Sequence, residues 1–142
     1  MRIRRAEADD VQAIAALERE CFSDAWSGKL IGDDLGCDTK YYFVAEESGV
    51  ISGYVSVYAV LDEGQIMRIC VTSAKRRNGT GEKLLRAVIE SLGSLVSSFT
   101  LEVRVGNTAA RNLYEKCGFV YEGVRPNYYE NGEGAGIYRL NI

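Results

Sequence analysis

Apolar residues recur along the chain with two different periods, one typical of helices and one typical of strands. Helical spacing, with apolar residues three and four positions apart, is clearest in the segment that contains Leu84, Leu85 and Val88. We expect Asp9 and Ser27 to be the N-caps of the first and second helices. The predicted helices are residues 9–22, 29–35, 79–95 and 109–116.

Strands follow the two-residue period, in which alternate side chains point to opposite faces of a sheet. The predicted strands are residues 1–6 at a sheet edge, 41–46, 50–60, 65–71, 99–105, 119–125 and 136–142. Three of them, separated by short turns, form a predicted antiparallel meander. The pattern therefore predicts one α+β domain, residues 1–142, with a mixed, mostly antiparallel central sheet of six to seven strands flanked by about four helices.

A short basic loop, residues 75–81, joins the strand ending at Val71 to the long third helix. Its two glycines let the backbone approach a ligand closely, and a helix start offers unpaired N–H groups and the positive end of a dipole. A phosphate fits such a place. The loop lacks the Gly-Lys-Ser/Thr of a Walker loop and the third glycine of the dinucleotide fingerprint. An ordinary strand-to-helix turn with solubilising charges remains the alternative.

Charge and composition narrow the function further. The chain has 142 residues, a net charge of −3, 46% hydrophobic and 26% charged residues, which is typical of a globular domain. Because a nucleic-acid binder of this size usually relies on a broad basic field, we expect no nucleic-acid partner. The chain has no histidine, which excludes Ser-His-Asp and Cys-His catalysis and every histidine metal site. We expect no metal.

The four cysteines, Cys21, Cys37, Cys70 and Cys117, include no C-x-x-C pair. Cys70 and Cys117 lie in apolar contexts and are predicted to be small core residues. We therefore expect reduced thiols and a cytoplasmic protein. No apolar run reaches membrane-spanning length, and no hydrophobic segment follows the basic N-terminus, so we expect no membrane association.

Two motifs resemble the GNAT family of N-acetyltransferases. The first is R-x-x-G-x-G, here Arg76, Gly79 and Gly81, between the fourth strand and the third helix. The second is Asn107 followed by residues 109–119, AARNLYEKCGF, which is similar to the family's N-x-x-A-x-x-L-Y-x-x-x-G-F stretch. The order of the elements extends the resemblance over nearly the whole chain. The resemblance implies a GNAT-type fold and acetyl-CoA as the cosubstrate.

Further stretches resemble the ribosomal-protein-alanine N-acetyltransferases, the RimI branch of this family. They are residues 21–27 (CFSDAWS), 61–63 (LDE), 101–104 (LEVR) and 127–129 (NYY). Ser73 departs from the pattern, since the family usually has proline before the loop. The resemblance implies acetylation of a protein N-terminus, in particular the N-terminal alanine of a small-subunit ribosomal protein. Other protein N-termini, a lysine side chain, a small amine and a non-catalytic acyl-CoA-binding role are the alternatives.

The resemblance also implies where acetyl-CoA binds. The backbone of Ile69, Cys70 and Val71 corresponds to the strand that pairs with the pantetheine arm, and the N–H of Val71 is expected to polarise the thioester carbonyl. Asn107, which by itself is a helix N-cap, is expected to contact the same molecule. The implied pyrophosphate cradle consists of Arg77, Asn78, Gly79, Thr80, Gly81 and Glu82.

Acetyl transfer to an amine needs a group that takes a proton from the ammonium and a donor for the departing thiolate. The resemblance assigns Glu102 as the base, acting through water, and Tyr114 as the acid. From the pattern alone, Glu102 is a solvent-facing residue of a half-exposed sheet and Tyr114 a core residue of its helix. The family match favours the catalytic reading of both.

Three aromatic residues are candidates for binding the acceptor. Tyr128 and Tyr129 lie in the loop before the last strand, and Trp26 precedes the second helix. They are expected to line the slot for a peptide N-terminus. The alternative is that they are aromatic residues packed on the surface of the protein.

Overall fold

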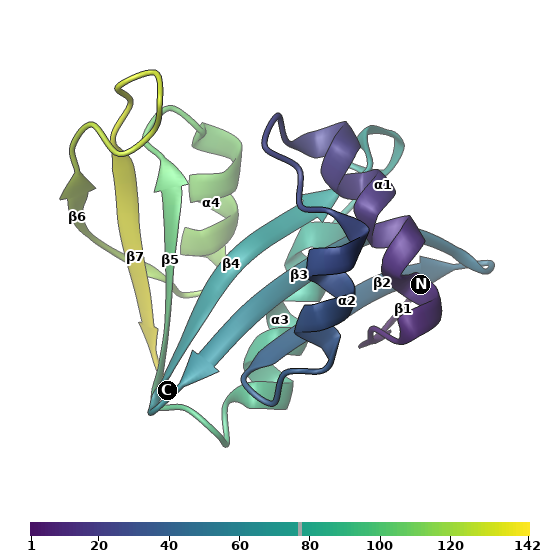
Figure 1. Cartoon of the computed structure of the whole chain (residues 1–142). Helices are drawn as coiled ribbons and strands as arrows, with labels where there is room; N and C mark the ends of the chain where they lie inside the picture. Colours follow the sequence, from purple (N-terminus) through teal and green to yellow (C-terminus); the bar gives the residue numbers. More distant parts are fainter. Residues whose placement is uncertain (77) are drawn as a thin grey trace.

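The structure, a computed structural model, describes residues 1–76 and 78–142. Its described residues form one seven-stranded sheet in the order β1-β2-β3-β4-β5-β7-β6, antiparallel except between β4 and β5 (Figure 1). The predicted α+β class and mostly antiparallel sheet are confirmed. The strands are β1 Arg2–Arg5, β2 Lys40–Glu47, β3 Val50–Val60, β4 Glu63–Val71, β5 Ser98–Arg104, β6 Val120–Arg125 and β7 Ala135–Asn141.

The helices cover both faces of the sheet. They are α1 Val11–Cys21, α2 Gly28–Leu35, α3 Thr80–Leu92 and α4 Thr108–Lys116, with short 3-10 turns at Ala8–Asp10 and Ser73–Lys75. Figure 1 shows α1 and α2 in front of the sheet and α3 behind it. Alternation along β2 explains the two layers: Tyr42 and Val44 pack with α1 and α2, whereas Phe43 and Ala45 pack with α3.

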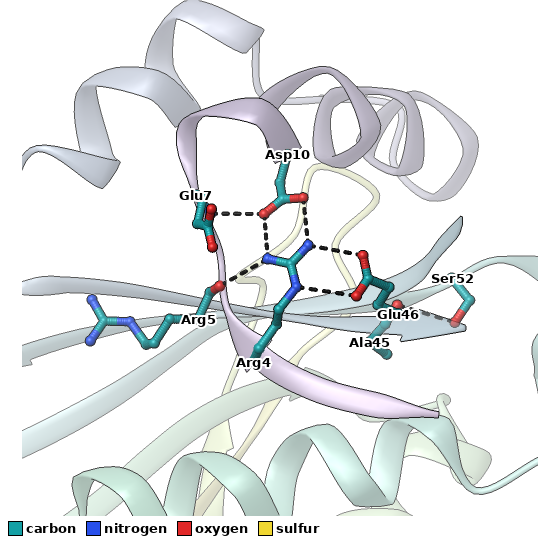
Figure 2. Close-up of polar contacts among 7 residues, drawn as sticks. All are labelled: Arg4, Arg5, Glu7, Asp10, Ala45, Glu46 and Ser52. Atoms are coloured by element: carbon teal, nitrogen blue, oxygen red, sulfur yellow. Dashed lines mark hydrogen bonds and ion pairs between the residues drawn. The ribbon is translucent and has the colours of Figure 1, made fainter. Parts of the chain in front are cut away.

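An ion-pair cluster holds the edge strand β1 against the front layer. Arg4 of β1 donates to both carboxylate oxygens of Asp10, at 2.8 and 2.9 Å, and pairs with Glu46 of β2 at 3.2 Å (Figure 2). Asp10 also accepts the N–H of Glu7 at 2.8 Å. The Arg4 guanidinium lowers the pKa of the Asp10 carboxyl. The cluster ties the first strand to the start of α1, close to the edge of the sheet.

The capping predictions had mixed outcomes. The Ser27 hydroxyl accepts the N–H of Leu30 at 3.1 Å and starts α2, as predicted. The expected cap at Asp9 is wrong: a 3-10 turn capped by Glu7 precedes α1, and Asp10 is the residue whose carboxylate holds that turn. Two adjacent aspartates look alike in the sequence, and only the neighbouring strand, through Arg4, distinguishes them.

The reduced-cysteine prediction is also corrected. Cys21 at the end of α1 and Cys70 in β4 form a disulfide, with 6.6 Å between their Cα atoms. The two residues are 49 positions apart, so their proximity arises only when α1 packs on the sheet. Cys37 is exposed and Cys117 is buried, and both are free thiols. Among the described residues, no helix is long and apolar enough to cross a membrane.

The arrangement that positions the site is the separation of β4 from β5. The two strands pair in parallel only from Glu63 to Ile66 and from Ser98 to Leu101. Beyond that point β4 continues along β3 while β5 continues along β7, which opens the V seen in Figure 1. A β-bulge lies at the fork, because Ser56 pairs with Arg68 and Val57 with Ile66, which leaves Met67 unpaired.

Candidate active site

A cavity of about 840 Å³ fills the mouth of the V between β4 and β5. It is walled by both strands, by the α1–α2 connection, by the start of α4 and by the β6–β7 loop. Seven of the residues predicted from the sequence line it together, although they come from five separate segments. They are Trp26, Ile69, Glu102, Asn107, Tyr114, Tyr128 and Tyr129.

Glu102 lies on β5, where alternation turns it away from the buried Leu101 and Val103 and into the cavity. Its side chain is 31% exposed and pairs with Arg125 at the end of β6, with 3.2 Å between the guanidinium nitrogen and the carboxylate oxygen. The carboxylate is therefore reachable from the cavity and already has one cationic neighbour. A ligand ammonium entering here would meet a preformed negative charge.

Tyr114 projects from α4 into the inner end of the same cavity and is 5% exposed. It packs against Phe119 and Tyr138, each with a ring-centroid distance of 6.2 Å. Burial raises the pKa of its phenol well above the usual range. Tyr114 thus belongs to the core and to the cavity at once, so the two interpretations from the sequence are compatible.

Tyr128 and Tyr129 stand at the cavity mouth on the β6–β7 loop, with their rings edge-on at 5.1 Å. Arg104 of β5 lies over the Tyr129 ring at 4.0 Å. The pKa of Tyr128 is raised first by burial and then by the nearby charge of Glu102. The Glu133 carboxylate anchors the loop by accepting the N–H of Gly106 at 2.9 Å and by pairing with Arg104 at 3.2 Å.

Trp26 forms the opposite side of the mouth, and Arg68 of β4 holds it there. The Arg68 guanidinium lies 4.4 Å from the Trp26 ring centroid and 4.2 Å from that of Phe22. Arg68 also pairs at 2.9 Å with Glu18, whose carboxylate is fully buried. That carboxylate accepts hydrogen bonds from the backbone N–H of Trp26, at 2.8 Å, and from the Tyr54 hydroxyl. The sequence analysis missed Arg68 and Glu18. In the sequence, each of them is visible only as a charged residue within an apolar pattern, Glu18 in the first helix and Arg68 in the run of residues 66–71.

The exposed edge of β4 carries the backbone groups predicted to meet acetyl-CoA. Thr72 donates to Ser52 O at 2.8 Å, which makes Gly53–Val71 a non-hydrogen-bonded antiparallel pair. The backbone N–H and C=O of Val71 therefore point away from β3, and so do those of Ile69 two residues earlier. Cys70, between them, directs its backbone groups to β3.

The start of α3 lies beside the end of β4. Gly79 has φ +80°, which favours glycine, and a Cβ added at Gly81 would lie 3.3 Å from Leu113 and 4.0 Å from Val71. Lys83 N–H bonds to Gly79 O at 3.0 Å, so the N–H groups of the first helical turn have no partner inside the helix. They point out from the helix start.

Side chains around this helix start make contacts that the sequence did not predict. The Thr80 hydroxyl is buried and has no hydrogen-bond partner among the described residues. The Glu82 carboxylate pairs at 2.9 Å with both Arg86 and Lys116, which lower its pKa. Arg76 donates to Val71 O at 3.0 Å, so it braces β4. Asn78 lies in the turn before the helix, and Arg77 lies outside the described residues.

Asn107 fulfils its predicted structural role. Its side-chain oxygen accepts the N–H of Ala110 at 3.1 Å and caps α4, while the residue borders the cavity. The same helix carries Tyr114, so the cap also fixes the position of the phenol. Gly118, with φ +96°, follows the end of α4 in the left-handed conformation that is common after helix C-termini.

The chain belongs to the GNAT acetyltransferase family, whose model matches residues 11–119. The chain is therefore an N-acetyltransferase, and the split β4–β5 pair with the cavity between the two strands is its candidate active site. This assignment agrees with the resemblance found in the sequence motifs.

Individual relatives make the comparison more specific. The [ribosomal protein bS18]-alanine N-acetyltransferase of Escherichia coli K12 is 32% identical over 93% of this chain and 89% of its own. The crystal structure of the Escherichia coli ribosomal-protein-S18-alanine N-acetyltransferase matches with a TM-score of 0.89, at 32% identity over 99% of this chain and 93% of that one. An N-alpha-acetyltransferase of Sulfurisphaera tokodaii is 30% identical over 94% of this chain and 89% of its own.

Proposed function

We propose that this protein transfers the acetyl group of acetyl-CoA to the N-terminal α-amino group of a protein, and that the acceptor is the N-terminal alanine of a small-subunit ribosomal protein. The observation that carries the proposal is that Glu102 and Tyr114 face one cavity whose mouth is formed by Trp26, Tyr128 and Tyr129. The names of the Escherichia coli and Sulfurisphaera tokodaii relatives support a protein N-terminus as the acceptor.

Acetyl-CoA fits the opposite side of the V. The unpaired N–H groups at the start of α3 suit the pyrophosphate, and Gly79 and Gly81 leave room for it to approach the backbone. The buried Thr80 hydroxyl adds a donor that nothing else among the described residues uses. The pantetheine amides match the outward-facing backbone groups of Ile69, and Val71 N–H would receive the thioester carbonyl oxygen.

The reaction begins with loss of a proton from the α-ammonium, since only the free amine has a lone pair. An unperturbed α-amino group has a pKa of about 7.7–8, so the cost is modest near neutral pH. Glu102 accepts that proton through a water molecule. Its ion pair with Arg125 orients the carboxylate in the cavity.

The amine nitrogen then attacks the thioester carbon, and the carbon–sulfur bond breaks as the thiolate leaves. The new amide nitrogen gives its extra proton to solvent, and the thiolate takes up a proton from solvent. Tyr114 stays protonated at every working pH because burial raises its pKa. An ordinary thiol, with a pKa of about 8.5, is the stronger acid. A hydrogen bond from Tyr114 to the developing thiolate is therefore favoured over complete proton transfer.

Mass spectrometry of a peptide panel incubated with acetyl-CoA tests the proposal. The panel contains the ribosomal alanine-terminated peptide, the same peptide with a blocked N-terminus and an internal lysine, peptides with other first residues, and small amines. Acetylation confined to the free alanine terminus is the expected result. Modification of the blocked peptide would identify a lysine acetyltransferase. Acetyl-CoA binding without any turnover would leave only a binding module.

The matched variants are Glu102→Gln and Glu122→Gln. Both glutamates lie on strands and pair with an arginine at 3.2 Å, but Glu122 does not line the cavity. Loss of the base should lower kcat by roughly 10²–10⁴-fold for Glu102→Gln, while the control keeps wild-type activity. Equal activity of the two variants would remove Glu102 from the mechanism.

A further inference from the structure

A second cavity of about 370 Å³ lies beside the active site, on the face of the sheet covered by α2. Its walls come from α2, from the facing ends of β2 and β3, and from β4 at the bulge. The motifs and the proposed acetyl transfer do not involve most of these residues. Its apolar lining includes Trp26, Leu30, Tyr58 and Met67. Val57 also borders it, but the Val57 side chain packs in the core on the other face of the sheet.

The second cavity is the immediate neighbour of the active-site cavity. Trp26 and Met67 line both cavities, so these two side chains form the wall between them. The bulge leaves Met67 out of the β3–β4 pairing and turns it outward, where it is 52% exposed. Leu30, on the far side of the second cavity, is 40% exposed. A ligand leaving the active site past Trp26 would therefore pass over an apolar rim.

The polar groups of the second cavity leave no net charge for a ligand to neutralise. The buried Asp34 carboxylate accepts the Tyr42 hydroxyl at 2.7 Å and pairs with Lys40 at 3.1 Å. Ser56, opposite the bulge, is different: its hydroxyl is buried, 3% of the residue is exposed, and it has no hydrogen-bond partner among the described residues. An apolar pocket with one free polar group is a typical small-ligand site.

We propose that the second cavity binds an apolar side chain of the acceptor polypeptide, one that follows the acetylated residue. The proposal rests on the proposed function, because the occupant is the acceptor itself. An extended chain held at the active site advances about 3.3–3.6 Å per residue, so a residue shortly after the first can reach across Trp26. A charged side chain would have to lose its water among Leu30, Tyr58 and Met67 without gaining a partner.

The test uses peptides that share the first residue and differ at one later position, from the second to the fifth, as leucine, methionine or aspartate. Alaninamide gives the baseline for an acceptor without later side chains. With saturating acetyl-CoA, kcat/KM should favour the apolar residue by about tenfold or more at one position. Leu30→Glu should reduce that preference to within about twofold.

The matched control is Leu95→Glu, which makes the same change at a leucine that is 56% exposed and lines neither cavity. It should retain the full preference. Fluorescence of Trp26, the single tryptophan, gives a second measurement on the wild-type protein. Acetylated product peptides with an apolar residue at the preferred position should change its emission at lower concentration than the aspartate forms when CoA is bound.

The outcomes separate the two proposals. Acetylation of all peptides at rates within about twofold, or a preference that Leu30→Glu leaves intact, overturns the second-cavity proposal alone. Absence of acetylation at any peptide N-terminus, with small amines acetylated, overturns the proposed function and the second-cavity proposal with it.

Discussion

Single residues in this site combine structural and chemical roles, and Tyr114 is the clearest case. Its ring packs with Phe119 and Tyr138 in the core between the sheet and helices α3 and α4, while its phenol faces the cavity. The same burial that stabilises the fold raises the pKa of the phenol. The pKa shift therefore restricts what Tyr114 can do: it remains a hydrogen-bond donor throughout the pH range in which the enzyme works.

Tyr114→Phe should lower kcat by about 10- to 100-fold, because a hydrogen bond to a charged leaving group is lost. The shape of the pH–kcat profile should not change, since the raised pKa puts the titration of Tyr114 outside the accessible range. Steady-state rates from pH 6 to 10 provide the measurement. Tyr121→Phe, at an exposed tyrosine that does not line the cavity, is the control. Disappearance of an alkaline limb in Tyr114→Phe would contradict this assignment.

Arg68 also combines two roles, because its side chain pairs with the buried Glu18 and contacts Phe22 and Trp26 of the α1–α2 connection. Arg68→Met should destabilise the protein by about 3 kcal/mol, since the buried Glu18 carboxylate loses its cationic partner. It should also raise KM for the peptide more than KM for acetyl-CoA, because Trp26 loses its support.

Urea unfolding and bisubstrate kinetics measure the two effects. Arg68→Lys keeps the charge but not the planar fork, so intermediate values are expected. Equal changes in both KM values would contradict this role.

At the scale of elements, the sequence predicts regular structure well and the relation between elements poorly. Strand β3 was predicted with the bounds it has, and Ser27 starts α2 as expected, because alternation and caps are local properties. The bulge at Met67 leaves no trace in an apolar run, and the parting of β4 from β5 depends on partners far along the chain. Motif resemblance, rather than periodicity, placed Glu102 and Tyr114 in one site.

The start of α3 offers a test at this scale. Gly79→Ala should destabilise the protein by about 1–2 kcal/mol, because alanine resists φ +80° even though its Cβ would have open space. It should also raise KM for acetyl-CoA, because the turn at Gly79 shapes the proposed pyrophosphate site. Gly32→Ala is the matched control: it too has open space, but it lies inside α2 without a positive φ, and alanine should stabilise that helix by about 0.5–1 kcal/mol. Thermal unfolding and acetyl-CoA titration separate the outcomes, and equal stability changes would contradict the backbone argument.

At the scale of the molecule, two cores lie on opposite faces of one sheet, and in the proposed function they keep the acetyl-CoA side and the acceptor side apart. The rear core packs α3 and α4 against the sheet, and the front core packs α1 and α2. The V between β4 and β5 lies between these layers, so in the proposed function the amine and the thioester would arrive from opposite directions. Trp26 on the α1–α2 connection of the front layer and Met67 of β4 separate the two cavities, so the attachment of the front layer to the sheet affects the proposed acceptor site.

That attachment should depend on pH through Asp10. Arg4 holds the pKa of Asp10 below its ordinary value of about 3.9. The contribution of the pair to the unfolding free energy is therefore fully present above that value and is lost as the pH falls through the lower, folded pKa.

Asp10→Asn should cost about 2 kcal/mol at pH 7, since charged hydrogen bonds to Arg4 are lost. The cost should shrink as the pH falls below 4, which makes the unfolding free energy of the variant less dependent on pH. Urea unfolding from pH 2.5 to 7 measures both curves, with Asp33→Asn, at an exposed pair with Lys29, as the control. If the wild-type and Asp10→Asn curves stay parallel down to pH 2.5, the Arg4–Asp10 pair does not fasten the front layer to the sheet.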